Sequence, residues 1–270
     1  MKTRVHHTFV TGLLPWIEPR RLLGPGAWTV EGRSAHAELV THAAADLAAR
    51  LHNVVIGGSP VALECSPPLP RDAVRAARTT DARRRREGSV GFSRPGVRLD
   101  PEGKVSLTPE DMALQLGNRL DGRTVIDAGC GAGGNTIGFA RAGCRVIAIE
   151  CDSARLADAR HNARIYGVEA RVEFVLGDAL ALLPKRADPE AVLFLDPPWG
   201  VEWAREGMGR DAFPLLDRVL SAGLAPLFNM TLCKLPPSFR VAELAGSRPE
   251  AVVGVGKGDD RRVKFLLVRV

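Results

Sequence analysis

The feature that most constrains the fold is a glycine-rich turn between a short apolar run and a helical pattern. Residues 123–127 (RTVID) are apolar enough for a buried strand, residues 129–134 (GCGAGG) follow directly, and residues 135–142 predict a helix that ends at Gly143. Glycine lets the backbone turn sharply and lets a ligand approach the main chain. The order of strand, turn and helix predicts a β-α-β unit with a ligand at the turn.

The same alternation continues through the rest of the chain. Further strands are expected at residues 145–150, 172–176 and 191–195, and further helices at 109–120, with Thr108 as N-cap, and at 153–166. Strands separated by helices predict an α/β fold with a mostly parallel, doubly wound, Rossmann-like sheet. Residues 251–255 and 263–270 predict an antiparallel C-terminal hairpin, which adds a reversed strand at the edge of the sheet.

The first 100 residues predict an α/β extension to the domain formed by residues 101–270. Strand-like segments occur at 7–10, 53–56 and 61–65, an alanine-rich helix is expected at 34–51, and another helix follows Pro70. The glycine- and proline-rich segment 88–103 is typical of a linker.

The positive charge of the chain is concentrated in this extension. The net charge is +6, and residues 71–98 hold nine arginines against three acidic residues, so the remainder is neutral. Arg71, Arg75, Arg78 and Arg85 recur on one face of the expected helix. We expect this segment, including the run Arg83, Arg84, Arg85 and Arg86, to bind the phosphates of an RNA substrate. A solvated helix face or a charged linker is the alternative.

Three acidic residues indicate what the glycine turn binds. Gly129, Gly131 and Gly134 satisfy the spacing of dinucleotide-binding loops, but Asp127 precedes them where a pyrophosphate would be repelled. An anion there suits the cationic amino-acid end of a ligand. Glu150, at the end of the next strand, suits ribose hydroxyls, and Asp178, after the third strand, suits the amine of adenine. An amino acid, a ribose and an adenine together predict S-adenosylmethionine.

A second motif, Asp196-Pro197-Pro198-Trp199, leaves the end of the fourth predicted strand, where open α/β sheets bind ligands. The Asp196 carboxylate and the Pro197 carbonyl are two acceptors for the hydrogens of one amine, and Trp199 offers a flat face for stacking a base. We therefore predict that Asp196, Pro197 and Trp199 form the catalytic centre. A rigid turn with a core tryptophan is the alternative.

Several segments resemble the trimethylguanosine synthase, or RNA cap guanine-N2 methyltransferase, family. They occur in the family's order, from about residue 105 to the C-terminus: 105–110 (VSLTPE), 127–136, 145–150 (RVIAIE), 162–167 (NARIYG), 174–178 (FVLGD) and 197–200 (PPWG). The resemblance implies a class I methyltransferase in which Trp199 stacks on the guanine. The candidate cofactor contacts within these segments are Thr108, Asp127, Gly129, Gly131, Gly133, Asn135, Thr136, Glu150 and Asp178. Asp196 and Val201 depart from the family, which has serine and glycine there.

The predicted reaction is methylation of an exocyclic amine, guanine N2 in RNA. A nucleoside-like or heteroaromatic small-molecule substrate and a non-catalytic RNA-binding protein are the alternatives.

The six histidines lack metal-ligand spacing, and five cysteines without a CxxC pair suit the reducing cytoplasm. No apolar stretch approaches the length of a membrane span, and residues 1–10 do not resemble a secretory signal. Lys234 is expected to be a loop lysine that could border the pocket.

Overall fold

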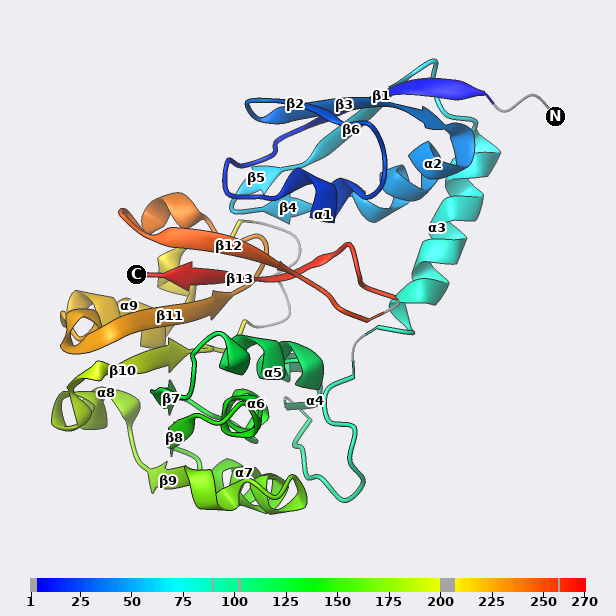
Figure 1. The fold of residues 1–270 in the computed structure, drawn as a ribbon. Coiled ribbons are helices and arrows are strands. Elements are labelled where there is room, and N and C mark those ends of the chain that lie inside the picture. The colour runs from blue at the N-terminus through cyan, green and yellow to red at the C-terminus, as the bar shows by residue number, and fades with distance from the viewer. Residues whose placement is uncertain (1–3, 89, 102, 200–206, 257) are drawn as a thin grey trace.

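The computed structural model describes the chain from residue 4 to residue 270, except residues 89, 102, 200–206 and 257 and the side chains of 104 and 105. Its larger sheet has the strand order β12-β13-β11-β10-β7-β8-β9 (Figure 1). The strands are β7 (Thr124–Ala128), β8 (Arg145–Glu150), β9 (Val172–Leu176), β10 (Asp188–Leu195), β11 (Phe228–Leu235), β12 (Arg248–Val253) and β13 (Val263–Arg269). Strands β7 to β11 pair in parallel, which confirms the predicted Rossmann-like fold.

Helices cover both faces of this sheet. They are α4 (Gly103–Ser106), α5 (Glu110–Asn118), α6 (Gly134–Arg141), α7 (Ser153–Ile165), α8 (Ala179–Leu182) and α9 (Pro214–Ser221). Alternate residues of a strand point to opposite faces. Accordingly, Val125 packs in a cluster with Met112 of α5, whereas Ile126 packs in a cluster with Leu216 of α9.

Two predicted details differ from the structure. Helix α5 begins at Glu110 with Pro109 at its N-cap, so Thr108 does not cap it. The C-terminal hairpin is confirmed, but the reversed strand β13 lies one position inside the sheet and β12 occupies the edge.

The N-terminal extension forms a second sheet in the order β2-β3-β1-β6, all antiparallel. Its elements are β1 (Val5–Thr11), α1 (Pro19–Leu23), β2 (Thr29–Glu31), β3 (Ser34–Val40), α2 (Thr41–Arg50), β4 (Val55–Ile56), β5 (Ser59–Pro60), β6 (Ala62–Ser66) and α3 (Arg71–Arg85). The helix predicted over residues 34–51 is therefore wrong in its first half. Residues 34–40 form β3 because Ala35, Ala37 and Leu39 alternate into the core while the strand pairs with β1.

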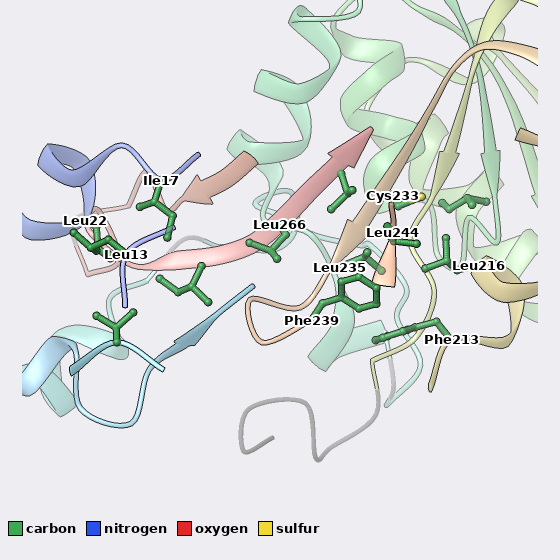
Figure 2. Close-up of a cluster of buried hydrophobic side chains, with 14 of the residues drawn as sticks. Leu13, Ile17, Leu22, Phe213, Leu216, Cys233, Leu235, Phe239, Leu244 and Leu266 are labelled. Atoms are coloured by element: carbon green, nitrogen blue, oxygen red, sulfur yellow. The ribbon is translucent and has the colours of Figure 1, made fainter. Parts of the chain in front are cut away.

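One hydrophobic cluster joins the two sheets. Leu13, Ile17 and Leu22 of the extension belong to the same cluster as Leu235 of β11 and Leu266 of β13 (Figure 2). The two halves of the chain therefore share a continuous apolar core.

The segment predicted as a linker is held against the larger sheet's helices. The Tyr166 hydroxyl accepts the Ser93 amide at 3.0 Å, and the Asn162 side chain exchanges hydrogen bonds with the Arg98 backbone at 2.8 Å. The part of this segment that the structure describes is thus a docked strap along α7. In the described parts of the chain, no helix has the length and apolar character that crossing a membrane requires.

Candidate functional site

The glycine turn has a backbone that only glycine adopts readily. Gly129, Gly131 and Gly133 have φ values of 84°, 54° and 89°, and the turn runs from β7 into α6. No described atom lies within 4 Å of the place where a Cβ on Gly131 would stand. At Gly131 the turn therefore presents bare main chain to open space, as cofactor binding requires.

Asp127 of β7 is buried, and only one of its two carboxylate oxygens is hydrogen-bonded within the described residues. The side chain is fully buried, its Oδ2 accepts the Thr136 hydroxyl at 2.5 Å, and its Oδ1 has no hydrogen-bond partner among the described residues. Burial, together with the charges of Asp196 and Glu150, raises the pKa of Asp127 to about 7 against the lowering effect of the Thr136 hydrogen bond. A buried carboxylate oxygen without a partner is the complement of a ligand cation.

Glu150 is hydrogen-bonded to the glycine turn itself, a contact that the sequence does not predict. Its Oε2 accepts the Gly131 amide at 2.9 Å, and its Oε1 accepts the amides of Cys151 and Asp152 at 2.9 and 3.0 Å. Only 6% of the residue is exposed. The carboxylate therefore also holds the glycine turn against the end of β8.

Asp178 lies at the carboxyl end of the next strand, as expected. It is exposed and caps α8 by accepting the Leu180 amide at 2.9 Å. Asp127, Glu150 and Asp178 thus follow one another along the same edge of three neighbouring strands, β7, β8 and β9.

Asp196 follows β10 and lies at the centre of a polar cluster. Its Oδ2 accepts from the Lys234 ammonium at 2.7 Å, the Asn135 amide at 2.8 Å and the Thr108 hydroxyl at 3.4 Å. Asn135 belongs to α6, directly after the glycine turn. The structure thereby brings the two sequence motifs into direct contact.

Lys234 is the residue whose importance the sequence does not reveal. The prediction of a loop lysine is wrong, because Lys234 lies within β11 and is 3% exposed. Besides the ion pair with Asp196, its ammonium lies 4.8 Å from the centre of the Trp199 ring and 5.5 Å from that of Phe265. The sequence evidence for a buried, ion-paired Lys234 is its place inside the apolar run LCKL, because a buried lysine is rarely left without an anion.

The rest of the second motif lies beside this cluster. Pro197 is buried, and Trp199 is half-buried against the hydrophobic clusters of both sheet faces. Because the Lys234 ammonium lies over the Trp199 ring, a stacked base would use the other ring face. Val201 lies outside the described residues.

The arginine run lies at the C-terminal end of α3, apart from this polar cluster. Arg84 contacts Asp46 at 2.7 Å and Arg85 contacts Asp81 at 3.1 Å, with half of each arginine side chain exposed. Arg83 and Arg86 are exposed. Arg84 therefore ties α3 to α2, whereas the pair of Arg85 and Asp81 lies within α3. No group of three or more histidine, cysteine, aspartate or glutamate side chains with a metal-binding arrangement occurs in the described residues.

The chain is similar in sequence to known and uncharacterised methyltransferases. Residues 122–230 match the model of the RNA cap guanine-N2 methyltransferase family. Trimethylguanosine synthase from Schizosaccharomyces pombe is 40% identical over 119 residues, which is 40% of this chain and 49% of that protein. An uncharacterised S-adenosylmethionine-dependent methyltransferase from Mycobacterium tuberculosis is 32% identical over 156 residues, which is 56% of this chain and 40% of that protein.

Among solved structures, an RNA methyltransferase from Salinibacter ruber in complex with S-adenosyl-L-homocysteine is 23% identical, with a TM-score of 0.39, covering 60% of this chain and 90% of that one. The chain spans about half the length or less of the two curated relatives described above. Residues 122–230 are thus similar to the RNA cap guanine-N2 methyltransferase family, and the comparisons with the larger sheet support an S-adenosylmethionine-dependent methyltransferase domain.

Proposed function

We propose that this protein transfers a methyl group from S-adenosylmethionine to guanine N2 in RNA. The observation that carries the proposal is the 2.8 Å hydrogen bond from the Asn135 amide to Asp196. It joins the acceptor for a target amine to the helix that starts at the glycine turn. The methyl donor and the amine can therefore meet at the edge formed by β7 and β10.

The cofactor side of the proposal rests on the fit of Asp127 and the glycine turn. The buried, unpartnered Oδ1 of Asp127 would accept the ammonium of the methionine end, and the bare main chain at Gly131 would lie against the cofactor. Glu150 would meet the ribose while still supporting the turn, and Asp178 would meet the adenine amine. When bound, the cofactor supplies an electrophilic methyl group on its sulfonium.

On the substrate side, Asp196 and the Pro197 carbonyl would accept the two hydrogens of the amine, and Trp199 would stack on the base. The transfer forms a carbon–nitrogen bond, breaks the sulfur–carbon bond and releases one proton from the amine, for which Asp196 is an acceptor. The departure from serine to Asp196 thus adds a carboxylate at the reacting nitrogen.

An RNA substrate is supported by the names of the relatives and by charge. Curated relatives include an uncharacterised RNA methyltransferase from Halalkalibacterium halodurans, 37% identical over 94 residues, which is 33% of this chain and 20% of that protein. Exposed Arg83 and Arg86 would add phosphate contacts. A cytoplasmic location belongs to the same proposal, because all five cysteines are free.

The test is mass spectrometry of nucleosides from total RNA incubated with the protein and deuterated S-adenosylmethionine, with the Asp196→Asn variant as control. We expect label in N2-methylguanosine for the wild type and little for the variant. Label in another nucleoside would overturn the guanine assignment. Label confined to small molecules would favour the heteroaromatic alternative, and no label with any substrate would favour a non-catalytic RNA-binding protein.

A further inference from the structure

We propose that the cleft between the N-terminal extension and the β12–β13 turn binds a backbone phosphate of the RNA substrate. The cleft has a volume of about 360 Å³ and is lined by Arg20, Gly24, Pro25, Gly26 and Arg261. This inference rests on the proposed function, because it names where the RNA is held outside the reacting centre.

The cleft is built around a buried arginine. Arg50 of α2 is 8% exposed and donates to the Leu22 carbonyl at 2.9 Å, the Leu23 carbonyl at 3.1 Å and the Arg261 carbonyl at 3.2 Å. It therefore ties the end of α1 to the turn of the methyltransferase sheet. Above it, the Arg261 guanidinium lies along Gly24, where a Cβ would stand 3.0 Å from its Nη1.

Positive charge exceeds negative charge around the cleft. Asp46 is shared by Arg50 and Arg84, Asp81 is shared by Arg85 and Arg262, and Asp260 lies 3.8 Å from Arg261. Arg20 forms no ion pair with the described residues. Arg21 pairs with Glu18, and Lys264 pairs with Asp259. These two pairs do not change the excess of positive over negative charge. Arg20 and Arg261 line the cleft, and these groups together contain six arginines and three carboxylates.

The excess positive charge affects Arg50, the buried arginine of this group. Burial lowers the pKa of Arg50, Asp46 opposes this effect, and the charges of Arg261 and Arg262 lower it further. An anion in the cleft would relieve this repulsion. Guanidinium groups form paired hydrogen bonds to phosphate oxygens, and Arg20 and Arg261 both line the cleft.

The cleft lies on the side of the sheet where the reaction is proposed. Strand β13 runs antiparallel to β11, with Leu266 opposite Leu235, so the turn before β13 projects past the carboxyl end of β11 (Figure 1). From strand spacing and rise, Arg261 lies on the order of 20 Å from Asp196. An RNA strand whose target base is at Asp196 can therefore place a phosphate a few nucleotides away in the cleft.

The test compares the double variant Arg20→Gln/Arg261→Gln with Arg145→Gln. Arg145 is exposed at the amino end of β8, on the opposite edge of the sheet. The probe is a fluorescent single-stranded RNA of about 20 nucleotides, titrated at several salt concentrations. We expect roughly tenfold weaker binding by the double variant, with the salt slope reduced by about 0.7, since one phosphate contact on a single strand contributes about 0.7.

Three outcomes decide the matter. An effect of Arg145→Gln as large as that of the double variant, or unchanged RNA affinity in the double variant, would overturn the cleft as an RNA site. Thermal protection of the wild type by inorganic phosphate, equal to that given by RNA and lost in the double variant, would assign the cleft to free phosphate instead. Cofactor affinity, measured in parallel, should stay unchanged, so failure of the cleft and failure of the methyltransferase proposal are separable.

Discussion

Two carboxylates at the ends of neighbouring strands have opposite electrostatic surroundings. Asp127 on β7 and Asp196 after β10 lie at the same sheet edge, where Phe194 pairs with Asp127. Asp196 accepts three hydrogen bonds on one oxygen, one of them from a buried ammonium. Asp127 accepts one hydroxyl, and its other oxygen has no partner among the described residues. In the described residues, the carboxylate of the proposed substrate half, Asp196, is paired with the Lys234 ammonium, whereas the carboxylate of the proposed cofactor half, Asp127, has no bonded cation.

The difference indicates what each half can bind. At Asp127, a bound cation would pair with the buried carboxylate oxygen that has no partner among the described residues. Binding would therefore remove the free-energy cost of burying that oxygen unpaired. Around Asp196, Lys234 supplies the counter-ion, so an uncharged amine is sufficient. Three substitutions and one change of pH test this contrast.

The largest effect is expected from Lys234→Met. Removing one partner of a buried ion pair leaves an uncompensated charge and typically costs about 3–5 kcal/mol of stability. The melting temperature should fall by about 10 °C, and methyl transfer should be lost. Lys185→Met, at an exposed lysine, is the matched control and should change little. Adding Asp196→Asn to Lys234→Met should recover part of the stability. A Lys234→Met protein that melts like the wild type would show that the pair does not stabilise the fold.

Asp196→Asn should reduce methyl transfer by roughly 10²–10³-fold, as expected for losing one charged group at the reacting centre. Cofactor affinity measured by calorimetry should change by no more than a few-fold, because Asp196 is proposed to meet the amine. If cofactor affinity fell as far as activity, the contrast between the two halves would be mistaken.

Asp127→Asn should act in opposite directions on binding and on stability. Losing a charge-assisted hydrogen bond of about 1.5–3 kcal/mol should weaken cofactor binding by roughly ten- to a hundredfold. The pKa of Asp127 is raised from 3.8 to about 7, so the folded protein favours the protonated form and ionisation destabilises it as pH rises through 7. The variant lacks this cost, and its melting temperature at pH 8 should rise. A lower melting temperature would contradict the account of Asp127 as an uncompensated charge.

The smallest effect concerns pH. With the pKa of Asp127 near 7, the carboxyl is increasingly protonated below that pH, and cofactor binding must displace the proton. Affinity should therefore fall roughly fivefold between pH 7 and pH 6. Asp127→Asn should abolish this dependence. Titrations of both proteins across the range measure it, and equal slopes would assign the titration to another group.

The sequence predicted the methyltransferase half because its signals are local. The apolar strands, the glycine turn and the acidic residues that follow the strands require no knowledge of distant partners, and the structure brings Asp127, Glu150, Asp178 and Asp196 to one edge. Their proposed roles in binding and catalysis stay predictions.

The missed features depend on contacts between distant segments. Alanines favour a helix over residues 34–40, and only pairing with β1 makes that segment a strand. Lys234 reaches Asp196 because the parallel register sets Leu195 beside Cys233, so the next residues on the two strands are neighbours. Neither register can be obtained from one segment alone.

The core shared by the two halves constrains how the protein is made. Leu13, Ile17 and Leu22 are synthesised more than 240 residues before Leu266, which belongs to the same cluster. Domains generally fold in the order in which they are synthesised, and exposed apolar surface on a growing chain attracts other chains. The N-terminal sheet must therefore keep part of its apolar surface uncovered throughout translation, which makes the nascent chain a natural client for chaperones.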